Sequence, residues 1–296
     1  MRNLQSIGLH YCDFSGTIPD WIGFLTSLTT LSLGNNRFHG DVPASIQNLK
    51  HLTFLSLDNN AGLTGDMTLF KDMTSIETFY VDNNSFNGKL DSFIGGWLNL
   101  QELDVSKNMI SGTIPQALIN HPTAVMLDLH NNYLQGTFPN DIFENTHLQY
   151  LHLYGNNLQG TIPDRIGYLK NMKHLDLSYN KLTGTIPDTV GTLTNLASFA
   201  LAENPLSNQG IPDLSKCTQL RELFMRNNHL TGRIPNWVGG LTSLMLLDLD
   251  NNGLSGSIPS TVGLLSSLNY LLLNRNALTG TIPSQLSSLH ALGTNF

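Results

Sequence analysis

One stretch decides the fold of this 296-residue chain: Leu148-Gln149-Tyr150-Leu151-His152-Leu153-Tyr154-Gly155-Asn156-Asn157-Leu158-Gln159-Gly160-Thr161-Ile162-Pro163. Leu151 and Leu153 alternate with polar or aromatic residues, which predicts a short strand with one buried face. The pattern returns every 24 residues, so that twelve copies and the start of a thirteenth fill the chain. The copies begin at Leu4, Leu28, Leu52, Ile76, Leu100, Ala124, Leu148, Met172, Leu196, Leu220, Leu244 and Leu268, and the thirteenth begins at Leu292. Such a fixed period predicts an α/β solenoid, a single domain over 1–296 in which each repeat packs only against its neighbours.

Three positions of the repeat predict how the chain turns after each strand. The position of Asn156 is Asn in eleven of the twelve repeats, and an amide there can satisfy the loop backbone. The position of Gly160 is Gly in eleven repeats and Asn208 in the other, which predicts a positive φ. Ten of the twelve prolines share the position of Pro163. The short segments that follow them predict 3₁₀ or single-turn helices on the convex side.

The Asn position and the element Gly160-Thr161-Ile162-Pro163 closely resemble the plant-type leucine-rich repeat, over essentially the whole chain. The resemblance implies a right-handed superhelix with a parallel concave sheet and a second short strand near the Gly-x-Ile-Pro element. It also implies an extracellular or secreted protein. Members include ectodomains of receptor-like kinases and receptor-like proteins, inhibitors of cell-wall polygalacturonases, and relatives that bind ice. The cysteine-paired caps usual in such members are missing here, and one glycosylation sequon begins at Asn83.

Repeats 3, 4 and 9 are among those that depart from the pattern. Repeat 3 has an extra residue within Asn60-Ala61-Gly62-Leu63 and Thr68 in place of proline, and repeat 4 has Asp91 there. We therefore expect the second strand to weaken across repeats 3 and 4. This irregularity fits either a local notch that binds a partner or neutral sequence variation that the repeat array tolerates. Repeat 9 carries Asn204-Pro205 and an extra residue before Ile211-Pro212.

Composition argues against several functions. Charged residues make up 12% of the chain and the net charge is −7, whereas nucleic-acid binding needs clustered Lys and Arg. Cys12 and Cys217 lie about eight strand spacings apart, roughly 40 Å, so we expect no disulfide between them. No apolar run reaches the roughly 20 residues of a membrane span, and no signal peptide is visible before the first repeat. We expect this segment to be cut from a longer protein and to make no membrane contact itself.

The concave face is the natural binding surface of such a solenoid. Positions 3, 5 and 7 of each repeat point to it, and repeats 5 to 8 gather acidic, aromatic and imidazole groups there. Aromatic and charged side chains together are typical of recognition surfaces. The predicted ligand-binding residues are Glu102, Asp104, Asp128, His130, Tyr150, His152, Tyr154, His174, Asp176, Tyr179, Glu222, Phe224, Arg226 and Asp248.

A catalytic or metal site is one alternative for this cluster. His152 has Asp128 and Asp176 one strand spacing away on either side, which would raise its pKa and allow a proton relay. His130, His152 and His174, however, lie on a diagonal with steps of about 8 Å, too far apart to ligate one ion at about 2 Å. An open face also offers no enclosed pocket. We therefore expect no enzyme activity, no cofactor and no metal. A solvated polar face without a ligand is a further alternative.

The charge of the concave face indicates the kind of ligand. Positions 2, 3, 5, 7 and 8 of the repeats carry eleven acids and five bases, a balance of −6, which is nearly the whole net charge of −7. A concave negative surface attracts cationic partners. We therefore expect a basic peptide or protein ligand centred on repeats 5 to 8.

The function expected from these residues is non-enzymatic recognition by part of a larger receptor-like or secreted protein. One alternative is a secreted inhibitor of a cell-wall-degrading enzyme. Another is ice binding through a column of threonines, which charged residues interrupt at Asp41, Asp66, Lys89 and Arg233. Four consecutive members of that column are Thr113, Thr137, Thr161 and Thr185.

Overall fold

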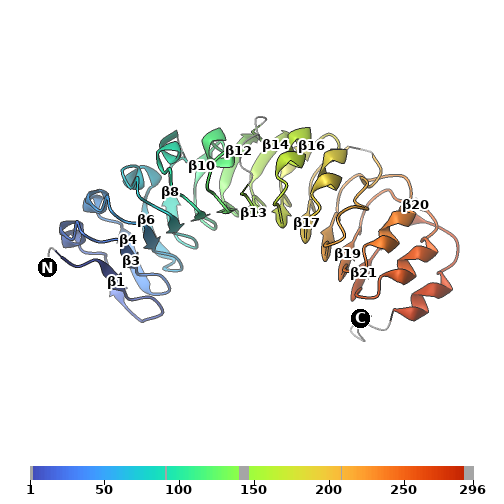
Figure 1. Cartoon of the computed structure of the whole chain (residues 1–296), viewed down its shortest axis with the longest axis horizontal. Helices are drawn as coiled ribbons and strands as arrows, with labels where there is room; N and C mark the ends of the chain where they lie inside the picture. Colours follow the sequence, from blue (N-terminus) through green and yellow to red (C-terminus); the bar gives the residue numbers. More distant parts are fainter. Residues whose placement is uncertain (1–2, 91, 140–146, 208, 290–296) are drawn as a thin grey trace. The chain divides into compact units, whose positions relative to one another are not determined.

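The structure, a computed structural model, describes residues 3–90, 92–139, 147–207 and 209–289. It contains two compact units, Met1–Leu148 and Gln149–Phe296, which hold repeats 1–6 and repeats 7–12. We describe each unit by itself. Both are built from the same layers, with the strands of a main sheet on one side and short helices on the other (Figure 1).

The alternating leucines of each repeat form one short strand of a parallel main sheet, as predicted. In unit 1 these strands are β1 (Ser6–Gly8), β3 (Thr30–Ser32), β5 (Phe54–Ser56), β7 (Thr78–Tyr80), β9 (Glu102–Asp104) and β11 (Met126–Asp128). In unit 2 they are β13 (Tyr150–His152), β15 (His174–Asp176), β17 (Ser198–Ala200), β18 (Glu222–Phe224), β19 (Leu246–Asp248) and β21 (Tyr270–Leu272). Neighbouring strands pair with a shift of one repeat, so that Leu31 pairs with Leu55 and Leu151 with Leu175. These four leucines are buried, and their columns form the core.

The asparagine column satisfies loop backbone groups, as predicted, and it also ties consecutive repeats together. Asn180 is a typical member: its Nδ2 donates to the carbonyls of Leu177 and Ser178 in its own repeat, at 3.1 and 3.0 Å. The same Nδ2 donates to the Leu153 carbonyl of the preceding repeat, at 3.0 Å. Its Oδ1 accepts from the amide N–H of Leu158, at 3.0 Å. One buried amide thus satisfies four backbone groups where the chain leaves the strand.

The glycine column has the predicted left-handed backbone, with φ between 73° and 149° at all eleven glycines. The expectation for Asn208 lies outside the described residues. The column has a second cause that the sequence did not indicate. A Cβ built on Gly184 would lie 2.6 Å from the methyl group of Thr161, and one on Gly136 would lie 2.9 Å from that of Thr113. Each threonine therefore packs where the next repeat has no side chain.

A second, shorter set of strands lies beside the main sheet of each unit. In unit 1 it comprises β2 (Ser15–Gly16), β4 (Arg37–Asp41), β6 (Gly62–Asp66) and β8 (Ser85–Asn87), then β10 (Ser111–Gly112) with β12 (Tyr133–Thr137). In unit 2 it comprises β14 (Asn157–Thr161) with β16 (Lys181–Thr183), and β20 (Ser255–Gly256) with β22 (Ala277–Leu278). We call these strands the side strands.

The predicted weakening of the side strands in repeat 3 is wrong. Strand β6 there is five residues long and pairs with both β4 and β8. The extra residue is absorbed before the strand, where Ala61 adopts a φ of 53°. The side strands are interrupted instead after repeat 4, where Lys89 and Ser111 form an isolated bridge, and in repeats 9 and 10, where the described residues 201–207 and 225–245 contain none.

Short helices cover the convex side, as predicted from the proline positions (Figure 1). In unit 1 they are η1 (Asp20–Phe24), η2 (Ala44–Asn48), η3 (Met67–Phe70), η4 (Ser92–Gly96) and α1 (Gln116–Ile119). In unit 2 they are η5 (Asp164–Tyr168), η6 (Asp188–Thr192), η7 (Asn236–Gly240), η8 (Ser260–Leu264) and η9 (Ser284–Ser288). A proline precedes most of them, as Pro163 does with a φ of −74° before η5. Repeat 3 lacks that proline, and Asp66 caps η3 instead by accepting from the Thr68 N–H at 2.8 Å.

Candidate functional site

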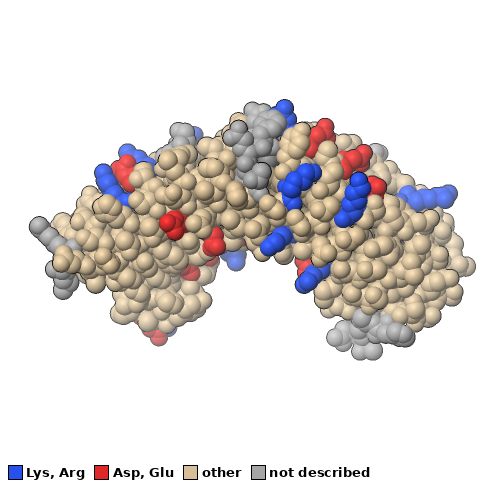
Figure 2. Space-filling view, viewed as in Figure 1, with Lys and Arg blue, Asp and Glu red and all other residues tan. Residues whose placement is uncertain are grey.

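In each unit the outward-facing residues of the main sheet form a concave face, which carries the predicted binding residues of that unit. Four of them belong to unit 1: Glu102, Asp104, Asp128 and His130. The other ten belong to unit 2. Charged side chains are scattered over the visible surface of both units (Figure 2), and the concave face is one of the places that carry them.

The concave face of unit 1 is a ladder of acids. In Asp128, Oδ1 lies 2.5 Å from the ring Nδ1 of His130. The same oxygen accepts from the His130 backbone N–H at 3.2 Å. Glu102 accepts a hydrogen bond from the hydroxyl of Tyr80 on the neighbouring strand. Burial and this bond to a carboxylate both raise the pKa of the Tyr80 hydroxyl, so the hydroxyl stays protonated.

Crowding of these acids changes their protonation. Burial raises the pKa of Asp82 to about 7, and the negative charges of Asp104 and Asp58 add to the effect. Burial likewise raises the pKa of Asp104, and the Asp128 carboxylate raises it further. A cation placed against this ladder would relieve the repulsion.

Three aromatic rings lie together on the concave face of unit 2. The rings of Tyr150 and His174 stack with their centroids 5.0 Å apart and 24° between their planes. The ring of His152 lies edge-on to His174, at 6.4 Å and 82°. Burial lowers the pKa of His174, and the neighbouring His152 lowers it further. The neutral ring therefore presents a largely apolar surface near neutral pH.

A hollow of about 300 Å³ also lies on the concave face of unit 2, and the sequence analysis did not predict it. Six of the ten predicted residues of unit 2 line it: Tyr154, Asp176, Tyr179, Phe224, Arg226 and Asp248. Its other lining residues are Ser178, Ala200 and Ala202. We call this hollow the concave pocket. The small side chains of Ala200 and Ala202 create it, because repeat 9 has nothing larger at positions 5 and 7.

Arg226 is the central charge of the concave pocket. Its guanidinium donates to the hydroxyl of Tyr179 and lies 6.0 Å from the centre of that ring. Its Nε lies 3.9 Å from Glu203 Oε1 and 4.0 Å from Asp248 Oδ2. Asp248 is only 3% exposed, and burial raises the pKa of its carboxyl while Arg226 opposes that rise. The pocket thus combines one partly exposed cation with acids and aromatic surface.

Comparison with known proteins assigns the chain to a family. Two profiles described as leucine rich repeat match it, one over residues 2–61 and 146–206 and the other over 99–121, 219–241, 243–265 and 267–289. This chain belongs to the leucine-rich repeat family. Among curated proteins it is similar to Receptor-like protein 7 of Arabidopsis thaliana, with 28% identity over 117 residues, which is 40% of this chain and 12% of that protein.

Solved receptor structures are similar to this leucine-rich repeat chain over nearly its whole length. The plant peptide hormone receptor RGFR1 in complex with RGF2 has 33% identity and a TM-score of 0.90, over 98% of this chain and 46% of the receptor chain. The PEPR1–AtPEP1 structure has 32% identity and a TM-score of 0.93, over 98% of this chain and 41% of that chain. The present chain therefore spans less than half the length of these relatives.

The remaining predicted features of this leucine-rich repeat chain have defined places. Asn83, the predicted glycosylation site, has an exposed side chain whose Nδ2 donates to Asn59 Oδ1 at 2.8 Å. Cys12 and Cys217 are both free thiols. Across the described ranges, no three His, Cys, Asp or Glu side chains are grouped so that they could hold a metal ion. No helix among the same residues is long and apolar enough to cross a membrane.

Sequence reasoning missed two features of the site. The first is the concave pocket, whose signal was the pair Ala200 and Ala202 in ladders of larger residues. The second is a column of left-handed residues at position 8 of the repeat, which includes Tyr179 at a φ of 52°. The signal there was the frequent Asn at this position, because Asn tolerates that backbone.

Proposed function

We propose that this chain is the ligand-recognition part of a larger receptor-like protein and that it binds a peptide or a small protein on its concave face. The concave pocket carries this proposal, because it offers a recess for a side chain beside exposed aromatic and charged groups. Similarity to receptor structures solved with peptides supports the same function. We propose no enzymatic activity and an extracellular location.

We further propose that ligands of this chain carry basic groups and that the acid ladder of unit 1 binds such groups. Asp82 and Asp104 support this class of ligand, because their raised pKa values reflect negative charges held close together with little solvent. A Lys or Arg side chain placed there would favour the ionised carboxylates. Electrostatic steering would then speed association at low salt and weaken as salt rises, since screening shortens to about 8 Å at physiological ionic strength.

A peptide panel tests the proposal. Synthetic peptides of about ten residues, matched in composition except for net positive or net negative charge, are titrated against the whole chain by biolayer interferometry. We expect binding to be concentrated among the positive peptides. In Ala202→Phe, the new ring fills the concave pocket and should weaken binding by about tenfold or more. The matched control is Ala277→Phe, an exposed alanine of unit 2 outside the pocket, which should leave binding unchanged. Equal effects of the two substitutions, or binding by negative peptides alone, would reject the proposal.

A further inference from the structure

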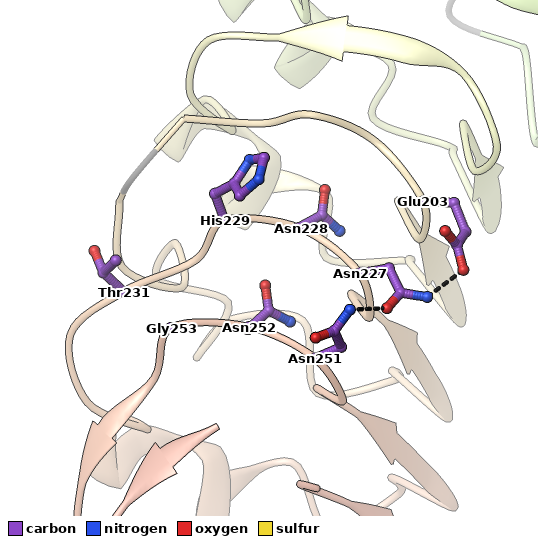
Figure 3. A pocket seen from close by; sticks show the side chains of 8 residues that line it. All are labelled: Glu203, Asn227, Asn228, His229, Thr231, Asn251, Asn252 and Gly253. Carbon is purple, nitrogen blue, oxygen red and sulfur yellow. Dashed lines mark hydrogen bonds between the residues drawn. The ribbon is translucent and has the colours of Figure 1, made fainter. Parts of the chain in front are cut away.

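A second pocket lies in unit 2 where the side strands are interrupted. Its volume is about 520 Å³, and its walls come from the loops that leave the main sheet in repeats 9, 10 and 11 (Figure 3). Its lining residues are Glu203, Asn227, Asn228, His229, Thr231, Asn251, Asn252 and Gly253. We call it the loop pocket. It shares no lining residue with the concave pocket, so it goes beyond the function proposed above.

The irregular course of repeat 9 explains why this pocket exists. In regular repeats the asparagine Oδ1 accepts from a backbone N–H of the preceding repeat, as Asn204 does from Leu182 at 3.0 Å and Asn252 from Leu230 at 3.1 Å. The equivalent donor for Asn228 would be the N–H of Leu206, which follows Pro205. That bond is not made: Asn228 Oδ1 is buried and accepts no hydrogen bond from the described residues.

Asn228 is nevertheless held firmly in place. Its Nδ2 donates to the carbonyls of Leu201, Met225 and Arg226 at 3.2, 3.1 and 3.0 Å, and the residue is only 6% exposed. The side chain therefore forms a fixed part of the pocket wall, with its oxygen turned toward the chain of repeat 9 (Figure 3). A buried acceptor without a donor is costly, so this wall of the pocket exists at the expense of one backbone hydrogen bond.

The other walls also offer hydrogen-bonding groups. The ring Nδ1 of His229 lies 3.1 Å from the carbonyl of Leu206, which can only accept, so Nδ1 carries a proton, and in this tautomer Nε2 is the acceptor of the ring. Asn251 donates to Asn227 Oδ1 at 2.5 Å, and Asn227 donates to Glu203, as the dashed lines in Figure 3 mark. These bonds hold a row of amides across the mouth of the pocket.

The loop pocket carries almost no net charge. Glu203 is its single ionisable carboxylate, and the Nε of Arg226 lies 3.9 Å from it. A ligand would therefore be selected by its hydrogen-bonding pattern and not by its charge. The volume falls within the roughly 300–1,000 Å³ usual for small-ligand sites, but those are mostly apolar and this one is lined by amides.

We infer that the loop pocket binds a neutral saccharide. A sugar ring presents several hydroxyls, each of which both donates and accepts. One hydroxyl would donate to His229 Nε2, while the side chains of Thr231 and Asn251 can receive or donate further bonds. An acidic saccharide would be repelled by Glu203, and a basic peptide would find there only this one carboxylate, which already lies 3.9 Å from Arg226.

A titration on the whole chain tests this inference. Cellotetraose, mannotetraose and maltotetraose serve as neutral probes, trigalacturonate as the charged comparison, and the positive peptides of the panel above as a different ligand class. The readout is the NMR shift of the side-chain amides of Asn227, Asn228 and Asn251, at probe concentrations up to about 10 mM. We expect at least one neutral saccharide to move these amides and to leave the concave pocket unchanged.

Two matched pairs of variants locate the binding. Thr231→Tyr fills the loop pocket and should weaken saccharide binding by about tenfold or more. Thr183→Tyr, at the same repeat position in a regular repeat, should change it by less than about twofold. Asn251→Gly removes a wall amide without straining its φ of 49°, and Asn131→Gly is its control at a φ of 50°.

The results separate this inference from the proposed function. The saccharide site would be overturned if no neutral saccharide shifts these amide signals, or if only the peptides shift them. Either result would leave the concave-face proposal standing. Equal losses for Thr231→Tyr and Thr183→Tyr would overturn it as well. Saccharide binding that is lost in Thr231→Tyr and kept in Ala202→Phe would support the loop pocket as a site of its own.

Discussion

Arg226 donates a hydrogen bond to the hydroxyl of Tyr179, although 47 positions and two repeats separate the two residues. The repeat between them presents Ala202, which is too small to fill the space on the concave face. The long arginine side chain therefore reaches across the position of a whole repeat. This contact gives the concave pocket a polar wall, and it holds a cation beside the buried carboxylate of Asp248.

Removing that cation should destabilise the protein in a pH-dependent way. Without Arg226, the pKa of Asp248 would rise further, because burial would be opposed only by the Asp250 backbone N–H. Arg226→Ala should lower the free energy of unfolding by about 1 kcal/mol at pH 8, where Asp248 is ionised. The loss should fade toward acid pH, where Asp248 is protonated in both folded and unfolded chains. Urea unfolding at several pH values measures it, with the exposed Arg221→Ala as control.

Asp82 should make the protein less stable as the pH rises. Its pKa is about 7 when folded and 3.8 as a free group, so the folded chain holds a proton there that the unfolded chain has lost. Stability therefore falls as the pH rises from about 4 to 7. Asp82→Asn should raise the free energy of unfolding by about 1–2 kcal/mol at pH 8, allowing for solvent screening, and by almost nothing below pH 4. A benefit that is independent of pH would contradict the crowding of the acid ladder.

The asparagine column offers a comparison of two nearly identical substitutions. Asn108 and Asn84 in unit 1 both donate to three carbonyls, but only Asn108 Oδ1 also accepts, from the Phe86 N–H at 2.9 Å. Asn108→Ala should cost about 2–3 kcal/mol of unfolding free energy, and Asn84→Ala about 1 kcal/mol less. Chemical denaturation of the two variants provides the test. Equal losses of stability would show that Asn84 Oδ1 accepts a hydrogen bond in solution.

The packing of threonine against glycine predicts a double-mutant effect. Gly184→Ala must adopt a φ of 73° and place its methyl group 2.6 Å from that of Thr161. Gly232→Ala faces a φ of 79°, and the nearest atom is 4.0 Å away. We expect Gly232→Ala to cost about 1 kcal/mol, and Gly184→Ala at least about 1 kcal/mol more. Adding Thr161→Ser should recover the difference, as measured by thermal unfolding. If Thr161→Ser leaves the stability loss of Gly184→Ala unchanged, the proposed packing of Thr161 against Gly184 is wrong.

Much of the fold follows from the sequence because it depends on residues that are close in the chain. Leu151 and Leu153 specify a strand by alternation, and Gly160 specifies a turn by its tolerance of positive φ. The period then places each strand beside the next. The polar and aromatic side chains of the concave face follow from the same alternation, so most of the lining of the concave pocket was predicted.

The two pockets could not be predicted from the sequence, because both arise where a repeat lacks a contact that other repeats make. The concave pocket depends on what Ala200 and Ala202 leave empty and on how far Arg226 reaches. The loop pocket depends on a missing bond between Leu206 and Asn228, which follows from the course of the chain after Pro205. In repeat 3, likewise, an extra residue was absorbed at Ala61 without loss of the side strand, contrary to prediction. The sequence shows that such repeats are irregular, but the path of the backbone determines whether a side strand is kept or a pocket forms.

Hydrogen exchange with a bound peptide tests the central claim most directly. The tightest-binding positive peptide of the panel is added to the whole chain, and amide exchange is followed by mass spectrometry with and without it. The account predicts slower exchange in the segments that line the concave pocket, Tyr179, Ala200 to Ala202 and Phe224 to Arg226. Protection confined to the convex helices or to the side strands, with the exchange of these segments unchanged, would contradict it.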